Sequence, residues 1–236
     1  MIRLQSGGIR REGLIMKLAK ARKTLIQCDF DGTITEEEVS YLLLDSFTSK
    51  EWRQLLQKYT EGKITVNSLN TEAFAMIKAD RKSLVRYING KVKIRNGFWE
   101  LVDYCQRQDY RFVIVSNGQD FYIEAILHDI GLEDIQVFAA QSRFLSEGLK
   151  VRYIGPDGTH LSDGFKEAYT ASFLKDGYQI IYIGNGASDY PAAKRCHHIF
   201  AKGELLTYCR KAGLDCNAFS DFNDIVKQME VSIFVG

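Results

Sequence analysis

The chain has few of the residues that cross-link or stiffen a protein: its 236 residues include only 2 Pro and 5 Cys. The cysteines are odd in number, widely spaced and form no C-x-x-C pair, which excludes a disulfide framework and a zinc site of the usual spacing. They are Cys28, Cys105, Cys196, Cys209 and Cys216. We therefore expect a cytoplasmic protein in which Cys28 is a buried thiol.

Long apolar runs and a positively charged body are also lacking. No run approaches the ~20 apolar residues that cross a bilayer, so we expect no membrane span. Residues 1–23 hold seven Lys and Arg and one Glu, which leaves 24 basic and 29 acidic residues in the remaining chain. Such an acidic body argues against nucleic-acid binding. We interpret residues 1–23 as a basic arm, or in part as residues upstream of a start at Met16, and not as a signal peptide.

Short strand-like runs alternate with longer helical patterns over the rest of the chain. The runs are 25–28, 112–115, 137–139, 180–183 and 199–201. This alternation predicts an α/β fold, a Rossmann-like parallel sheet with helices on both faces. Residues 143–145 and 150–154 are expected to add a small hairpin.

More than 80 residues separate the first two runs, although a crossover needs only about a dozen. Helical spacing recurs in this interval at 39–47, 52–59, 69–76 and 84–88. We therefore predict a helical cap over residues 36–95, inserted after the first strand, and a catalytic core of residues 24–35 and 96–236. Trp52, Tyr59 and Phe74 are expected in the interior of the cap.

The segment Asp29–Thr33, with sequence D-F-D-G-T, directly follows the first predicted strand. Ligands of open α/β sheets bind beyond the carboxyl ends of strands, and two carboxylates there can act as nucleophile and acid. Such close like charges need a cation or a shared proton. The alternative for this segment is an Asp-Gly turn with solvated acids.

Three further segments follow later in the chain. Ser116 offers a hydroxyl, and Asn117 and Gly118 offer N–H groups at a helix start, so these residues are candidates for binding a phosphoryl oxygen. Lys166 can neutralise an oxyanion, and residues 184–189 offer oxygen ligands to a cation such as magnesium. A common turn, a solvated lysine and a plain loop are the respective alternatives. The occurrence of all these polar segments at successive strand ends nevertheless favours one shared site.

The order D-x-D-G-T, S-N-G, Lys and G-N-x-x-x-D resembles the haloacid dehalogenase superfamily over residues 24 to 230, and its D-x-D form resembles the phosphatase branch. The cap is similar to that of phosphoserine-phosphatase-like members, and residues 200–222 resemble the methionine-salvage phosphatases. The resemblance implies that Asp29 is the nucleophile that forms an aspartyl-phosphate and that Asp31 is the general acid and base. It also implies that Ser116 and Lys166 hold the phosphoryl oxygens.

The resemblance implies a Mg²⁺ cofactor held by the Asp29 carboxylate, the Asp31 main-chain carbonyl, Asn185 and, directly or through water, Asp189. The family usually has Asp where this chain has Asn185. The neutral amide removes one negative charge, so magnesium affinity is expected to fall unless Asp189 compensates.

Glu38 lies nine residues after Asp29, where phosphoserine phosphatases place a Glu near the substrate amino group. Glu38 is thus a candidate substrate-binding residue for an amino-bearing ester, or a solvated residue of an acidic run. Candidate carboxylate clamps in the cap are Arg53, Arg81, Arg86 and Arg95.

These observations predict a magnesium-dependent phosphomonoesterase that hydrolyses a small phosphorylated metabolite. A phosphosugar mutase or phosphotransferase is one alternative. A non-catalytic protein that binds a phosphorylated ligand is the other, and it is motivated by Asn185.

Overall fold

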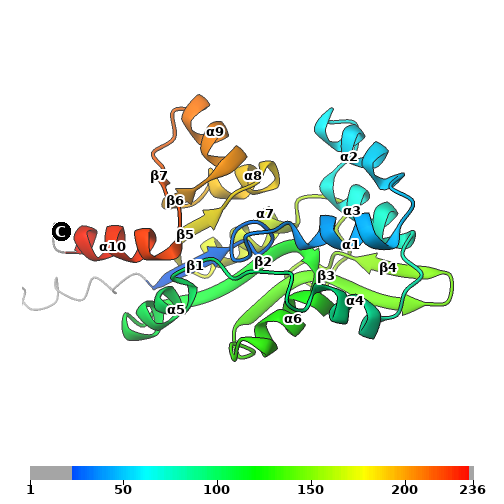
Figure 1. Ribbon diagram of the computed structural model, residues 1–236. Helices are drawn as coiled ribbons and strands as arrows, with labels where there is room; N and C mark the ends of the chain where they lie inside the picture. Colours follow the sequence, from blue (N-terminus) through cyan, green and yellow to red (C-terminus); the bar gives the residue numbers. More distant parts are fainter. Residues whose placement is uncertain (1–22, 234–236) are drawn as a thin grey trace, which may run out of the picture.

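The computed structural model describes residues 23–233, so most of the predicted basic arm lies outside the described residues. A seven-stranded sheet with the order β4-β3-β2-β1-β5-β6-β7 forms the centre (Figure 1). Its strands are β1 (Thr24–Cys28), β2 (Arg111–Gln119), β3 (Gln136–Leu145), β4 (Gly148–Arg152), β5 (Gln179–Gly184), β6 (His198–Ala201) and β7 (Asn217–Ala218). All neighbouring pairs are parallel except β3 and β4. The expected α/β fold with a parallel sheet is confirmed.

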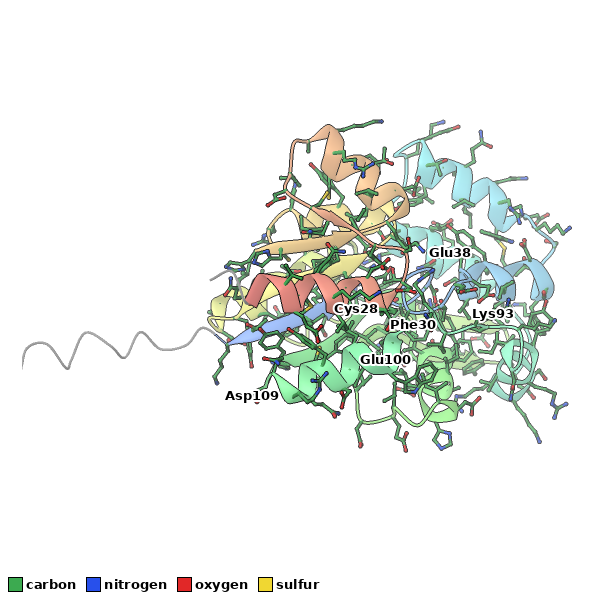
Figure 2. All side chains as sticks on the ribbon, turned by 60° about the vertical axis from the view of Figure 1, so that its left-hand side comes forward. Cys28, Phe30, Glu38, Lys93, Glu100 and Asp109 are labelled. Carbon is green, nitrogen blue, oxygen red and sulfur yellow. The ribbon has the colours of Figure 1, made fainter. Side chains whose placement is uncertain are left out.

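The central strand β1 is buried because it lies between two parallel neighbours and under helices. Leu25, Ile26 and Cys28 are fully buried, as expected for an apolar run in a parallel sheet. Cys28 and Phe30 lie inside the molecule, whereas Asp109 lies at its edge (Figure 2). Cys28 is the expected buried thiol.

Four helices are inserted between β1 and the returning helix α5 (Phe98–Arg107). They are α1 (Val39–Phe47), α2 (Trp52–Thr60), α3 (Val66–Ala75) and α4 (Arg81–Ile88). Thr65 and Asp80 cap α3 and α4 by accepting the backbone N–H groups of Ser68 and Ser83. The four helices gather at one end of the sheet, opposite α10 (Figure 1). They form the helical cap that the sequence predicts.

The remaining helices cover the sheet. They are α6 (Asp120–Asp129), α7 (Phe165–Lys175), α8 (Tyr190–Ala193), α9 (Gly203–Lys211) and α10 (Phe222–Ile233). The predicted hairpin is present, with Arg143 opposite Lys150. The two-residue strand β7 was not expected, because so short a segment has no periodicity. None of the helices within residues 23–233 is long and apolar enough to cross a membrane.

The topology brings three strand ends together. β1 pairs with β2 on one side and with β5 on the other. The segments after these strands therefore meet at the carboxyl edge, where open α/β sheets bind their ligands. The N–H of Asp29 donates to the carbonyl of Ile183 at 2.9 Å, which fastens the first of these segments to β5.

Candidate active site

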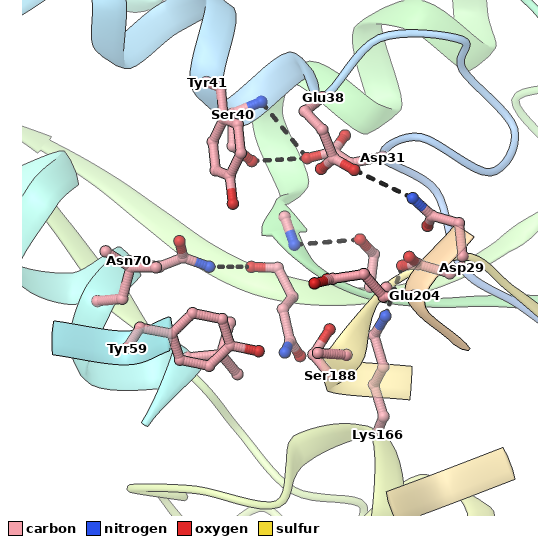
Figure 3. A pocket seen from close by; sticks show the side chains of 18 residues that line it. Asp29, Asp31, Glu38, Ser40, Tyr41, Tyr59, Asn70, Lys166, Ser188 and Glu204 are labelled. Carbon is pink, nitrogen blue, oxygen red and sulfur yellow. Dashed lines mark hydrogen bonds and ion pairs between the residues drawn. The ribbon is translucent and has the colours of Figure 1, made fainter. Parts of the chain in front are cut away.

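A cavity of about 110 Å³ lies at this carboxyl edge, between the core and the cap. All the predicted site residues except Asp189 line it. They are Asp29, Asp31, Glu38, Ser116, Asn117, Gly118, Lys166 and Asn185 (Figure 3). Strand ends of the core supply the acids and the hydroxyl, and the cap side supplies Glu38.

The buried ammonium of Lys166 lies between two carboxylates. Its Nζ is 2.7 Å from Oδ1 of Asp29 and 2.6 Å from Oδ1 of Asp189. Burial alone would lower the pKa of Lys166, but the carboxylates of Asp189 and Asp29 raise it above its ordinary value. Lys166 is therefore a fixed positive charge beside Asp29.

Asp29 has one oxygen engaged and one available. Over residues 23–233, Lys166 holds Oδ1 and no hydrogen bond or ion pair holds Oδ2. Burial, and then the charge of Asp189, raise the pKa of Asp29 to about 7, against the lowering effect of Lys166. A cation beside Asp29 would favour the ionised form that a nucleophile requires.

The two oxygens of Asp31 also differ. Oδ2 accepts hydrogen bonds from Ser40 Oγ at 2.6 Å, Tyr122 OH at 2.5 Å and the Ser40 N–H at 3.4 Å. Oδ1 is buried and has no partner in the described part of the chain. Burial raises the pKa of Asp31 to about 6, against the lowering effect of its hydrogen bonds from Ser40 and Tyr122. A carboxyl group with this pKa can donate and accept a proton near neutral pH.

Asp189 is fully buried and lies behind the cavity. Its Oδ1 accepts from Lys166 and from Tyr182 OH at 2.7 Å. Its Oδ2 accepts the N–H groups of Asn185 at 3.0 Å and Gly186 at 2.9 Å. These contacts favour a role in holding Lys166 and the loop after β5, whereas ligation of a metal by Asp189 stays a prediction.

The oxygen and the nitrogen of the Asn185 side-chain amide both form hydrogen bonds with residues that follow β1. Its Oδ1 accepts from Thr33 Oγ1 at 2.8 Å, and its Nδ2 donates to Glu38 Oε1 at 3.1 Å. A Cβ at Gly32, whose φ is +70°, would lie 2.4 Å from both Asn185 Nδ2 and Glu38 Oε1. Glycine is therefore required at this position by both its conformation and its neighbours.

The residues present fit a magnesium ion. Magnesium is bound by a few protein oxygens and keeps several waters. The Asp31 carbonyl has no protein partner within residues 23–233, and the Asp29 carboxylate and the Asn185 amide contribute two further oxygens. Glu38 is a further carboxylate nearby; burial, and then the charge of Asp31, raise its pKa to about 7.

The S-N-G segment differs from the prediction in its local structure. β2 continues to Gln119 and α6 begins at Asp120, so Ser116 lies within the strand and not at a helix start. The register shifts between Val115 and Gln119, and such an irregularity redirects side chains at a strand end. The carbonyl of Asn117 accepts hydrogen bonds from Asn70 and Tyr153, at 2.9 and 2.7 Å.

Several residues of the site carry no motif in the sequence. The cap contributes Ser40, Tyr41, Tyr59, Val66, Leu69 and Asn70, and the core contributes Glu204 (Figure 3). Trp52 and Phe74 are buried in the cap as expected, but Tyr59 lines the cavity and is not an interior residue. Helical periodicity places such residues on a helix face, and only the packing of the cap on the core decides which face meets the acids.

None of the four candidate arginine clamps lines the cavity. Arg53 pairs with Asp45 on the surface, and Arg95 donates to the carbonyls of Gly32 and Thr33. Arg81 donates to the carbonyl of Phe121, and Arg86 is exposed. Among the residues that the structure describes, Lys166 is the only cationic side chain that lines the cavity. Its ammonium already forms ion pairs with Asp29 and Asp189.

Comparison with known proteins agrees with this geometry. The family model of the haloacid dehalogenase-like hydrolases matches residues 26–194. The chain belongs to this family.

Curated relatives are phosphatases by name, which confirms the expected enzyme class. The 2-hydroxy-3-keto-5-methylthiopentenyl-1-phosphate phosphatase of Bacillus pumilus (strain SAFR-032) is 27% identical over 89% of this chain and 92% of that protein. The enzyme of the same name from Exiguobacterium sibiricum is 28% identical over 88% and 96%.

Solved structures share the fold. A phospho-aspartyl intermediate analogue of phosphoserine phosphatase has a TM-score of 0.68 and 19% identity, and the match covers 88% of this chain and 99% of that one. A substrate-bound phosphoserine phosphatase has a TM-score of 0.66, with 19% identity over 87% and 98%. The phosphoserine-phosphatase-like fold that the resemblance implies is confirmed.

Proposed function

We propose that this protein is a magnesium-dependent phosphomonoesterase that hydrolyses a small phosphorylated metabolite through an aspartyl-phosphate. One observation carries the proposal. Asp29, Asp31 and Lys166 line a single cavity. Asp29 contacts the ammonium of Lys166 and has one oxygen without a protein partner in the described residues, and Asp31 also has one such oxygen. This arrangement provides a nucleophile, a cation and an acid.

In the first step, Oδ2 of Asp29 attacks the phosphorus, the ester P–O bond breaks, and Asp31 gives its proton to the leaving alkoxide. Ser116 and Lys166 hold phosphoryl oxygens while their charge develops. In the second step, the now ionised Asp31 removes a proton from water, which attacks the phosphorus and releases phosphate from Asp29. Magnesium, held by Asp29, the Asp31 carbonyl and Asn185, supplies charge neutralisation when bound.

We infer that the substrate carries no carboxylate near its phosphate. The cavity offers no cation beyond Lys166 among the described residues, whereas Tyr59, Val66 and Leu69 provide apolar surface. A second cavity of about 370 Å³ shares Tyr59 and Val66 with it and leaves room for the rest of the leaving group. The one cationic side chain among its described lining residues, Lys63, is exposed and pairs with Glu61. A methylthio-ketopentenyl phosphate, which names the relatives in Bacillus and Exiguobacterium, fits these requirements, and phosphoserine does not.

A phosphate-release screen tests this function. With Mg²⁺, the full chain is expected to release phosphate from carboxylate-free phosphomonoesters and to prefer them to phosphoserine by about tenfold or more, since a buried carboxylate without a partner is costly. Chelation with EDTA is expected to abolish release. Binding of phosphate esters without turnover at any metal concentration would establish the non-catalytic alternative, and transfer to a second sugar phosphate without free phosphate would establish the mutase.

The substitution Asn185→Asp has two opposite expected effects. Without metal it places a carboxylate where the amide now donates to Glu38 at 3.1 Å, so the free energy of unfolding should fall by about 1–3 kcal/mol. With Mg²⁺ the added charge should tighten binding, as measured by isothermal titration calorimetry. The double variant with Glu38→Gln is the control, because it removes the repulsion and should recover the metal-free stability. Unchanged stability and unchanged Mg²⁺ affinity would contradict this account of Asn185.

A further inference from the structure

The carboxylate of Asp31 is held from two separate parts of the fold. Ser40 belongs to α1, the first helix of the cap, and Tyr122 belongs to α6 of the core. Both hydroxyls bond to the same oxygen, Oδ2, at 2.6 and 2.5 Å. The two hydroxyl oxygens also lie 2.8 Å from each other. The result is a closed polar cluster around one oxygen of the acid.

The cluster is buried, and the neighbouring chain leaves space for it. Tyr122 is completely buried and Ser40 is nearly so. A Cβ at Gly118 would lie 2.1 Å from the Tyr122 hydroxyl and 3.1 Å from Asp31 Oδ2. The glycine of the S-N-G segment thus leaves the space that the phenol occupies beside the acid, and any other residue there would displace the phenol.

The asymmetry between the two Asp31 oxygens has a chemical consequence. A protonated carboxyl group carries one O–H donor and keeps acceptor capacity on its other oxygen. Oδ2 already accepts from the donors of Ser40 and Tyr122, and Oδ1 has no partner in the described part of the chain. Asp31 lines the cavity, and a proton on Oδ1 has no protein partner that would retain it.

We propose that Ser40 and Tyr122 are positioning residues for the general acid, which hold Oδ2 of Asp31 so that Oδ1 presents the proton to the leaving-group oxygen. The proposal rests on the phosphatase function proposed above. Because Ser40 lies on α1, the acid is completed only when this part of the cap is docked on the core. The cap thus contributes to the chemistry as well as to the choice of substrate.

The leaving group provides a selective test. An activated ester such as p-nitrophenyl phosphate expels a weakly basic phenolate and needs little protonation, whereas an alkyl ester such as glycerol 2-phosphate needs a well-placed acid. Tyr122→Phe and Ser40→Ala are expected to lower kcat/KM for the alkyl ester by about tenfold or more. The same variants should lower kcat/KM for the nitrophenyl ester by less than about threefold, because this ester depends little on the acid.

Tyr104→Phe is the matched control. Tyr104 is also buried, and its hydroxyl has no partner within residues 23–233, so this variant removes a buried phenol hydroxyl that does not line the cavity. Along a series of aryl phosphates with leaving groups of graded pKa, log kcat/KM should fall more steeply with leaving-group pKa for Tyr122→Phe and Ser40→Ala. The control should keep the native slope. Thermal melts verify folding, and Ser40→Ala carries the test if Tyr122→Phe does not fold.

Equal losses on both esters, or a slope unchanged in both variants, would overturn the positioning role and leave the phosphatase intact. Failure of the native chain to release phosphate from either ester would instead overturn the proposed function, and the positioning role with it.

Discussion

Replacing Asp29 with Asn is expected to lower phosphate release by about 10³-fold or more, because the neutral amide cannot act as the anionic nucleophile. The fold should persist. The amide oxygen can still accept from Lys166, which keeps its second partner, Asp189. The measurement is kcat/KM with Mg²⁺, together with the midpoint of unfolding in urea.

Asp103→Asn is the control for this substitution, since Asp103 is exposed on α5 and pairs with Arg107 at the surface. It should leave both the rate and the urea midpoint unchanged. Full activity of Asp29→Asn would show that another group attacks the phosphorus.

Replacing Lys166 with Met is expected to affect stability and activity together. The side chain is 2% exposed and bridges Asp29 and Asp189, so its removal leaves two buried carboxylates without their cation. The loss of one partner from a buried ion pair costs about 3–5 kcal/mol of unfolding free energy. Phosphate release should fall by about 10²-fold or more, because Lys166 no longer holds a phosphoryl oxygen.

Lys175→Met, at the exposed end of the same helix, is the matched control and should change neither quantity appreciably. The stability loss of Lys166→Met should shrink at pH 5, because protonation of one carboxyl group then removes the repulsion between Asp29 and Asp189. A loss of the same size at pH 5 and pH 8 would argue against the electrostatic origin.

The sequence by itself determined the architecture and the chemical class. β1 and β5 are short, mainly apolar runs, and each is followed directly by a polar segment. Because the carboxyl ends of parallel strands meet at one edge, Asp29 and Asn185 could be placed together without coordinates. The cap helices α1 and α2 could be predicted for a similar reason, since helical periodicity is a local property.

The tertiary structure alone decided which hydrogen bonds the side chains of the site make. Tyr122 and Ser40 are 82 residues apart in the sequence, yet both reach Asp31 Oδ2. Asp189, which is also an expected magnesium ligand, uses both oxygens on Lys166, Tyr182 and backbone N–H groups. The physical reason is that a strand or helix is specified by neighbouring residues, whereas these hydrogen bonds depend on how the cap and the core pack together. That packing leaves no periodic signal in the sequence, and only the folded chain shows which oxygen of each carboxylate remains available.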